Sequence, residues 1–271
     1  MRCAVLGDPI EHSLSPALHR AGYAAAGLDW QYDACRVASG GLAAFLGDLD
    51  DSWRGLSLTM PLKREAVGLV VSLTPTAAAT GAANTLLLGP DGPAGDNTDV
   101  PGAVAALAER GVGSVAAATI LGGGATATSV GLALAGLGCG SITLLVRDAV
   151  RAAETVDRLS RHPAAPAVAV GDLGSAAVSG DIVVSTIPAS AQDDALVDRS
   201  SQVPVVFEVL YDPWPTPLAA AATAAGRTLV SGLDLLVHQA ALQFELFTGA
   251  PAPVGEMRRA GEDALRTRVT P

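Results

Sequence analysis

Along the first hundred residues, short segments that are apolar or alternate between apolar and polar residues are followed by segments whose apolar residues have helical spacing. The apolar and alternating runs predict strands at Cys3–Gly7, Gln31–Val37, Gly55–Thr59 and Ala82–Leu88. Helical spacing predicts helices at Ser15–Gly27, Gly40–Leu49 and Pro61–Val71. Ser15 is expected to be the N-cap of the first helix, with Pro16 at its first position. Strands that alternate with helices indicate crossover connections and a largely parallel sheet.

The alternation continues over residues 100–230 and is typical of a doubly wound, Rossmann-type fold that binds nucleotides. Helices are expected at Val100–Arg110, from the glycine turn to about Leu137, and at Ala149–Arg161. Strands are expected at Val115–Leu121, Ile142–Val146, Ala167–Val170, Asp181–Ser185, Val205–Glu208 and Thr228–Val230. Two long helical segments, Leu233–Phe247 and Gly255–Arg268, are expected to return to the first unit. We therefore predict a two-domain α/β protein. Residues 1–100 and 234–271 would form one domain, and the inserted residues 101–233 would form the dinucleotide-binding domain.

Composition excludes several classes of protein. A formal net charge of −10 disfavours a nucleic-acid binder, because phosphates would be repelled. Three widely spaced cysteines suit neither a disulfide framework nor a metal site. The uncharged stretch Ser114–Val146 has the length of a membrane span, but its Gly122–Gly124 triplet favours strand, turn and helix. No signal peptide is visible at the N-terminus, so we expect a globular cytoplasmic protein without a metal or a membrane partner.

Residues that are rare in this chain mark candidate chemistry. Lys63 is the only lysine among 17 basic residues, and Asn84 and Asn97 are the only asparagines. An ammonium group can lose its proton when its pKa falls, whereas a guanidinium group keeps its proton at working pH. Lys63 paired with a carboxylate such as Asp99, with amides nearby, could bind a polyhydroxylated substrate and transfer a proton. Asp99 could also simply cap the helix that follows it.

The segment Gly122–Ala127 matches G-x-G-x-x-A after a strand and before a helix, which predicts a dinucleotide site. The helix N-terminus would face the phosphates. At the end of the next predicted strand, Arg147 and Arg151 lie four residues apart and could share a helical face that binds a 2′-phosphate. These arginines favour NADP, while Asp148 between them keeps NAD as the alternative.

Several ordered motifs resemble the shikimate dehydrogenase family across nearly the whole chain. They are G-x-P-x-x-H-S-x-S-P-x-x-H from Gly7 to His19, T-x-P-x-K from Thr59 to Lys63, G-x-x-N-T from Gly81 to Thr85 and N-T-D-x-x-G from Asn97 to Gly102. Two more begin at Tyr211 and Gly232. The resemblance implies reversible, NADP-dependent reduction of 3-dehydroshikimate to shikimate, a step of aromatic amino-acid biosynthesis. The partner would be this small-molecule substrate, and the protein would be a monomer or homodimer.

The resemblance also implies roles for individual residues. Lys63 and Asp99 would be the catalytic pair. Ser13, Ser15, Thr59 and Tyr211 would bind the substrate carboxylate, and Asn84 and Gln239 the ring hydroxyls. The cofactor would contact Gly122, Gly123, Gly124, Ala125, Thr126, Ala127, Arg147, Arg151, Thr186 and Gly232. Ala125 and Asp148 depart from the usual family pattern and leave cofactor preference open. A quinate/shikimate or aminoshikimate dehydrogenase and a non-catalytic NADP-binding sensor are the alternative functions.

Overall fold

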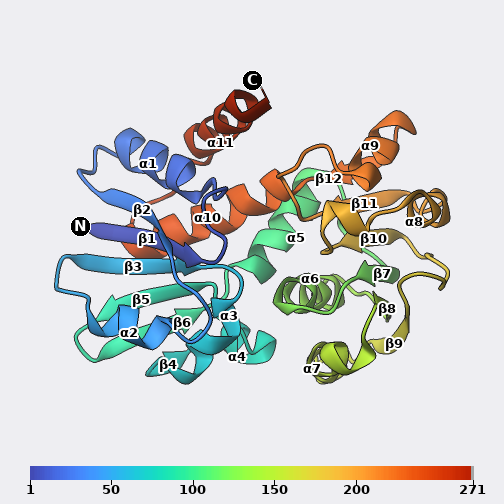
Figure 1. Ribbon diagram of the computed structural model, residues 1–271, viewed down its shortest axis with the longest axis horizontal. Coiled ribbons are helices and arrows are strands. Elements are labelled where there is room, and N and C mark those ends of the chain that lie inside the picture. Colours follow the sequence, from blue (N-terminus) through green and yellow to red (C-terminus); the bar gives the residue numbers. More distant parts are fainter. Residues whose placement is uncertain (270–271) are drawn as a thin grey trace. The chain divides into compact units, whose positions relative to one another are not determined.

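The computed structural model describes residues 1–269, and the chain divides into two compact units. Unit 1 comprises residues 1–98 and the chain from residue 236 onward, and unit 2 comprises residues 99–235. Each unit contains one six-stranded sheet (Figure 1). The C-terminal helical segment therefore belongs to the same unit as the N-terminal strands.

The sheet of unit 1 is mixed, with strand order β2-β1-β3-β5-β6-β4. Its strands are β1 (Arg2–Gly7), β2 (Gln31–Arg36), β3 (Trp53–Leu58), β4 (Ser72–Leu73), β5 (Thr85–Gly89) and β6 (Gly92–Asp96). β1 runs parallel to β2 and β3, whereas β5 is antiparallel to both β3 and β6. β4 runs parallel to β6, so β5 is the one strand of the six that runs against the others. The expectation of a largely parallel sheet is therefore confirmed for this unit, with β5 as the exception. The turn between Gly89 and Gly92 closes a hairpin, and the glycine- and proline-rich β6 lacks the usual signal of a strand.

The helices of unit 1 are α1 (Ser15–Ala25), α2 (Leu42–Gly47), α3 (Leu62–Glu65), α4 (Pro75–Thr80), most of α10 (Gly232–Thr248) and α11 (Val254–Val269). The helix predicted over Pro61–Val71 is wrong in length, because α3 tightens into a 3₁₀ turn at Ala66–Gly68. The predicted capping by Ser15 is also wrong. Leu14 is the N-cap of α1 without a side-chain hydrogen bond, and Ser15 is the first helical residue.

The sheet of unit 2 is parallel throughout, with strand order β9-β8-β7-β10-β11-β12. Its strands are β7 (Ala117–Leu121), β8 (Ser141–Val146), β9 (Ala167–Asp172), β10 (Ile182–Ser185), β11 (Val205–Glu208) and β12 (Thr228–Val230). Read along the chain, this is the order 3-2-1-4-5-6 of dinucleotide-binding folds. The strand order reverses between β7 and β10, which is where such folds bind their ligands.

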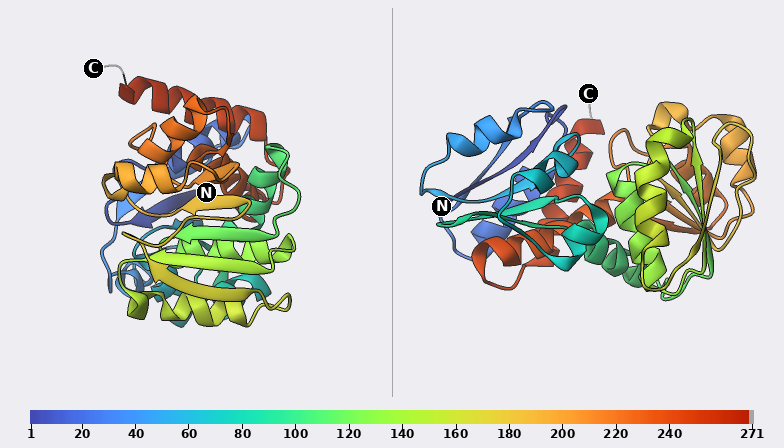
Figure 2. Two further views of the ribbon diagram at one scale, coloured as in Figure 1. Left: turned by 90° about the vertical axis from the view of Figure 1, so that its right-hand side faces the viewer. Right: turned by 90° about the horizontal axis from the view of Figure 1, so that it is seen from below.

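Helices cover both faces of this sheet (Figure 2). They are α5 (Asp99–Glu109), α6 (Ala125–Gly136), α7 (Ala149–Ser160), α8 (Asp194–Arg199) and α9 (Pro217–Ala224). Val184 packs into one core with α5, α6 and α7, while its neighbour Val183 packs into the other with α8 and α9. Both faces of the inner strands β7, β10 and β11 are buried, which explains their continuous apolar runs, whereas the edge strand β9 is largely exposed. The predicted α/β class is confirmed, although the short α4, α8 and α9 were not predicted.

Candidate active site

The chain leaves β7 through a glycine turn. Gly122 has φ +109°, and a Cβ on it would lie 2.3 Å from Thr186 Oγ1, so no other residue fits there. A Cβ on Gly123 would lie 2.8 Å from the Cβ of Ala152 on α7. A Cβ on Gly124, in contrast, would meet open space. The turn is therefore closely packed on its inner side and accessible at Gly124, where a ligand can approach the backbone.

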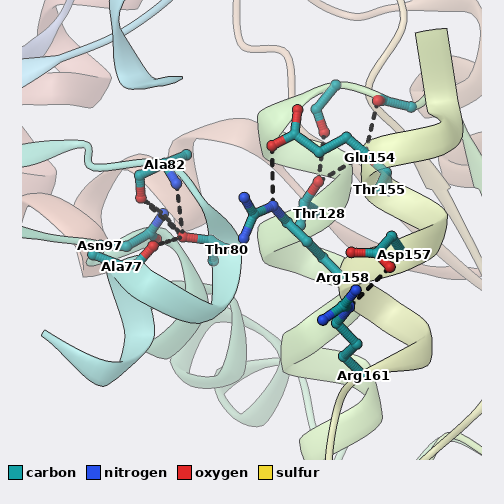
Figure 3. Close-up of polar contacts among 12 residues, drawn as sticks. Ala77, Thr80, Ala82, Asn97, Thr128, Glu154, Thr155, Asp157, Arg158 and Arg161 are labelled. Atoms are coloured by element: carbon teal, nitrogen blue, oxygen red, sulfur yellow. Dashed lines mark hydrogen bonds and ion pairs between the residues drawn. The ribbon is translucent and has the colours of Figure 1, made fainter. Parts of the chain in front are cut away.

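Two buried threonines hold the carbonyl groups of this turn (Figure 3). Thr155 Oγ1 donates to the carbonyl of Gly123 at 2.8 Å, and Thr128 Oγ1 lies 2.8 Å from Thr155 Oγ1 and 3.2 Å from the carbonyl oxygen of Gly124. Because Thr155 uses its proton on Gly123, the single proton of Thr128 is shared between Thr155 Oγ1 and the carbonyl of Gly124. The C=O and N–H of a trans peptide point in opposite directions. Thr155 therefore turns the N–H of Gly124 away from itself, a role that the motif did not reveal. The carbonyl of Gly124 also accepts from the N–H of Thr128 at 3.0 Å, which turns the N–H of Ala125 out of the helix end.

The first turn of α6 has the features of an anion site. Gly124 is the N-cap and makes no side-chain capping bond. Ala125 and Thr126 are half-buried, whereas Ala127 is fully buried in the core between helix and sheet. The first N–H groups of a helix lack partners within the helix and carry the positive end of its dipole. A phosphate group would be stabilised at this position.

The start of α7 carries the charges expected to select the cofactor. Arg147, Asp148 and Arg151 are all exposed. Asp148 is the N-cap of α7, and its Oδ1 accepts from the N–H groups of Val150 at 2.9 Å and Arg151 at 3.4 Å. Arg147 precedes the cap, so the prediction that the two arginines share one helical face is wrong. The Asp148 carboxylate binds the N–H groups of the first turn of α7. The two guanidinium groups of Arg147 and Arg151, beside the end of β8, are therefore the groups that could bind a phosphate.

Thr186 and Gly232 are held by backbone contacts within unit 2. The N–H and Oγ1 of Thr186 both donate to the carbonyl of Leu121, at 3.0 and 2.8 Å. This ties the segment after β10 to the end of β7. A Cβ on Gly232 would lie 2.4 Å from the carbonyl oxygens of Val209 and Leu210. Gly232 is therefore required where α10 begins against the segment that follows β11.

The segment that carries Tyr211 is anchored by Glu208, which the sequence analysis did not single out. Glu208 is fully buried at the end of β11 and accepts from Leu210 N at 3.1 Å, Gln192 Nε2 at 2.7 Å and Thr216 Oγ1 at 2.8 Å. Burial raises the pKa of this carboxyl group, and the hydrogen bonds oppose that shift. The sequence signal that could have indicated Glu208 is its position as an acidic residue at the end of an apolar strand.

Two predicted substrate residues lie together where the segment after β1 enters α1. Ser13 Oγ accepts from the N–H of Ser15 at 3.3 Å. Ser15 is 5% exposed, and its hydroxyl interacts with that of Tyr32. Burial raises the pKa of Tyr32, and its hydrogen bonds with Ser57 and Ser15 oppose the shift. The structure thus brings the two serines together and adds a buried phenol behind them.

Thr59 and Lys63 follow β3, which runs parallel to β1. The N–H of Thr59 donates to the carbonyl of Leu6 at 2.9 Å. Gly7 is required beside it, because a Cβ there would lie 2.3 Å from Thr59 Cγ2. Lys63 is half-buried in α3, and its carbonyl accepts from the N–H of Ala83 at 2.8 Å. The carboxyl ends of β1 and β3 therefore place both residues at the edge of the sheet where Ser13 and Ser15 lie.

Asn84 and Gln239 are in contact although 155 residues separate them. Asn84 Nδ2 lies 3.3 Å from Gln239 Oε1, and both side chains are buried. The Asn84 amide also accepts from the N–H of Thr98 at 2.8 Å and donates to its Oγ1 at 2.9 Å. A hydroxyl both donates and accepts, so the adjacent Nδ2 and Oε1 suit it once their mutual contact opens.

Asp99 is the first residue of α5 and is 5% exposed. It belongs to unit 2, whereas Lys63 belongs to unit 1, so the pairing of the two stays a prediction. Among residues 1–269, no group of three or more His, Cys, Asp or Glu is arranged to hold a metal ion. Within the same described part, no helix is long and apolar enough to cross a membrane.

A parallel sheet in the order 3-2-1-4-5-6, with a glycine turn at its switch point, defines an α/β protein with a Rossmann-type unit. Residues 5–86 match the model of the shikimate dehydrogenase substrate binding domain, and residues 232–260 match that of the shikimate 5'-dehydrogenase C-terminal domain. The shikimate dehydrogenase (NADP(+)) of Moorella thermoacetica is 35% identical over 97% of this chain and 92% of its own. The chain belongs to the shikimate dehydrogenase family, as its motifs predicted.

Solved structures give the same result. Mycobacterium tuberculosis shikimate dehydrogenase is 39% identical with a TM-score of 0.88, covering 97% of this chain and 99% of that chain. The Thermus thermophilus shikimate 5-dehydrogenase in complex with NADP(H) and shikimate is 28% identical with a TM-score of 0.82, covering 97% and 99%. The similarity therefore extends over both units.

Proposed function

We propose that this protein is an NADP-dependent shikimate dehydrogenase that reversibly reduces 3-dehydroshikimate to shikimate, a step toward chorismate and the aromatic amino acids. The observation that carries the proposal is the 35% identity, over 97% of this chain, to a relative named shikimate dehydrogenase (NADP(+)). Unit 1 is the substrate domain. Unit 2 is the dinucleotide domain and is inserted in the sequence between the two parts of unit 1.

The substrate lies at the edge of the unit 1 sheet where β1 and β3 end. Ser13 and Ser15 bind its carboxylate by hydroxyl hydrogen bonds, with Thr59 and Tyr211 assisting. Asn84 and Gln239 bind ring hydroxyls, with the Asn84 amide as donor and the Gln239 carbonyl as acceptor. These contacts orient the ring so that one carbon–oxygen bond faces the catalytic pair.

Lys63 and Asp99 carry out the proton transfer. In reduction, Lys63 donates a proton to the carbonyl oxygen as negative charge develops there, and in oxidation it takes the proton back. The positive charge of Lys63 stabilises that oxygen, and Asp99 is its partner in the catalytic pair. A lysine can fill this role because, unlike arginine, it releases its proton at accessible pH.

Unit 2 fits a dinucleotide with a 2′-phosphate. The open space at Gly124 and the first turn of α6 suit the pyrophosphate, and Arg147 and Arg151 suit the 2′-phosphate. The Asp148 carboxylate caps α7, which favours NADP over NAD, because its oxygen is already bonded to backbone N–H groups. Gly122, Gly123, Ala125, Thr126, Ala127, Thr186 and Gly232 shape the remainder of this site. NADPH supplies the hydride for reduction when it is bound.

The test is the initial rate of NADPH formation at 340 nm with shikimate and NADP, compared with quinate, aminoshikimate and NAD. We expect kcat/KM to be highest for shikimate with NADP. A higher value for quinate or aminoshikimate would assign a related dehydrogenase. NADPH binding without turnover of any of the three would assign a sensor. A cytoplasmic location and a monomeric or homodimeric state are also part of the proposal, and light scattering in solution tests the oligomeric state.

A further inference from the structure

A buried chain of hydrogen bonds runs beneath the proposed substrate site in unit 1. The hydroxyl of Tyr32 donates to Ser57 Oγ at 2.5 Å, and Ser57 Oγ donates to Gln243 Oε1 at 2.7 Å. Gln243 Nε2 donates to Thr85 Oγ1 at 2.9 Å, and Thr85 Oγ1 donates to Asn84 Oδ1 at 2.8 Å. All five side chains are at most 4% exposed. The chain connects β2, β3, β5 and α10 within one unit.

Backbone groups fix the direction of donation in this chain. Gln243 Nε2 also donates to the carbonyl of Asn84 at 3.0 Å, and a carbonyl can only accept. The Gln243 amide nitrogen must therefore face β5, which leaves its Oε1 to accept from Ser57. At the other end, the N–H of Thr98 donates to Asn84 Oδ1 at 2.8 Å, and an N–H can only donate. Both amides consequently have one orientation that satisfies every partner named.

We propose that Gln243 is a positioning residue that, through Thr85, acts together with the N–H of Thr98 to hold the amide of Asn84 in the orientation that faces the substrate. Gln243 donates to Thr85 Oγ1, so the single proton of Thr85 is directed to Asn84 Oδ1. Asn84 Nδ2 then faces Gln239, whose own orientation is fixed by a 3.0 Å bond from its Nε2 to the carbonyl of Leu236. A donor and an acceptor are thereby presented side by side to a ring hydroxyl.

This inference rests on the proposed function, since it assigns the position of a proposed substrate residue. Gln243 does not belong to the proposed site and acts only through Thr85 and the Asn84 backbone. Its loss would allow the Thr85 hydroxyl to rotate away from Asn84 Oδ1 and would loosen the Asn84 amide, which the N–H of Thr98 would still hold, so substrate binding is weakened more than the chemical step. A purely structural role would instead reduce the amount of folded enzyme and leave the KM for shikimate unchanged.

The test compares steady-state kinetics of the wild type with Gln243→Met, which keeps the length of the side chain without its amide. We expect the KM for shikimate to rise about tenfold, as for one hydrogen bond of about 1.4 kcal/mol, with kcat within about threefold and the KM for NADP unchanged. Arg54→Met is the matched control, because Arg54 Nε also joins β3 to α10 through the carbonyl of Phe247 at 2.9 Å, outside the chain of hydrogen bonds. Its KM for shikimate should equal that of the wild type.

A second pair of variants keeps the proposal testable if Gln243→Met does not fold. Thr85→Val should raise the KM for shikimate about as much as Gln243→Met, while Thr85→Ser, which retains the hydroxyl, should stay within about twofold. The double variant with Gln243→Met should be no worse than either single variant, because both break one link. An unchanged KM in folded Gln243→Met or Thr85→Val, or an equal rise in Arg54→Met, overturns the proposal. A wild type that does not turn over shikimate overturns the proposed function itself.

Discussion

The two proposed binding regions are positioned by different means. In unit 2, the glycine turn is shaped by the lack of side chains at Gly122–Gly124 and by two hydroxyls that hold carbonyl groups. In unit 1, the Asn84 amide is held by the N–H of Thr98 and by the side chain of Thr85, which Gln243 of the distant helix α10 orients. A backbone site can be found in the sequence because its residues are consecutive. A side-chain site is assembled by the fold, and its supporting residues leave no local pattern.

The largest effect on ligand affinity that distinguishes the backbone site of unit 2 from the side-chain site of unit 1 is expected at Gly124. Gly124→Ala places a Cβ in open space, so the melting temperature should stay within about 2 °C of the wild type. The Kd for NADPH, measured by fluorescence titration, should rise about 100-fold, because the added methyl group occupies the space of a phosphate. Gly136→Ala is the control, since it also meets open space on α6 but lies at the far end of the helix. Unchanged NADPH affinity in Gly124→Ala would remove the glycine turn from the cofactor site.

A buried histidine in unit 1, which packs against Tyr32 of the buried chain of hydrogen bonds, predicts how the stability of the protein depends on pH. His19 is fully buried and stacked on Tyr32 with 4.1 Å between ring centroids. Burial lowers its pKa from 6.5 to about 3. Neither ring nitrogen has hydrogen-bond geometry to a described residue, although Gln243 lies close enough to oppose part of the shift. The folded protein therefore keeps this imidazole neutral where the unfolded chain protonates it.

The contribution of the neutral His19 to the free energy of unfolding is fully present above pH 6.5. It declines as the pH falls from 6.5 toward about 3. Between pH 8 and pH 5, this decline should lower the free energy of unfolding by about 2 kcal/mol. Urea denaturation at both pH values measures the loss, and His19→Phe should remove it. Glu208 acts in the opposite sense, because its raised pKa favours the folded state as the pH falls. An equal decline in His19→Phe would show that the buried imidazole is not the cause.

A smaller effect is expected from the hydroxyls beneath the glycine turn. Thr155→Val leaves the carbonyl of Gly123 without its 2.8 Å bond, so the Kd for NADPH should rise about fivefold, as for a hydrogen bond of about 1 kcal/mol. Thr155→Ser should restore the affinity. Thr119→Val removes a similar buried bond, to the carbonyl of Ser179 at 2.7 Å, away from the turn, and should leave the Kd unchanged. Equal affinities in Thr155→Val and Thr119→Val would assign Thr155 to stability alone.

The sequence predicts the fold of unit 2 because β7, the glycine turn and α6 follow one another along the chain, and each has a sequence pattern typical of its structure. It misses β6, since Gly92, Pro93 and Gly95 weaken every preference for a strand, and pairing with β5 and β4 orders them. Ser57 and Gln243, 186 residues apart, carry no shared pattern that would indicate their contact. Lys63 and Asn84 could be singled out because their residue types are scarce in this chain.

The central claim is that Lys63 transfers the proton in an NADP-dependent oxidation of shikimate. The most direct measurement compares Lys63→Met with the wild type for two quantities, the Kd for NADPH and kcat at saturating shikimate and NADP. We expect an unchanged Kd and a kcat about 1,000-fold lower, because the general acid–base group is lost. A Lys63→Met enzyme with kcat near that of the wild type would contradict this claim.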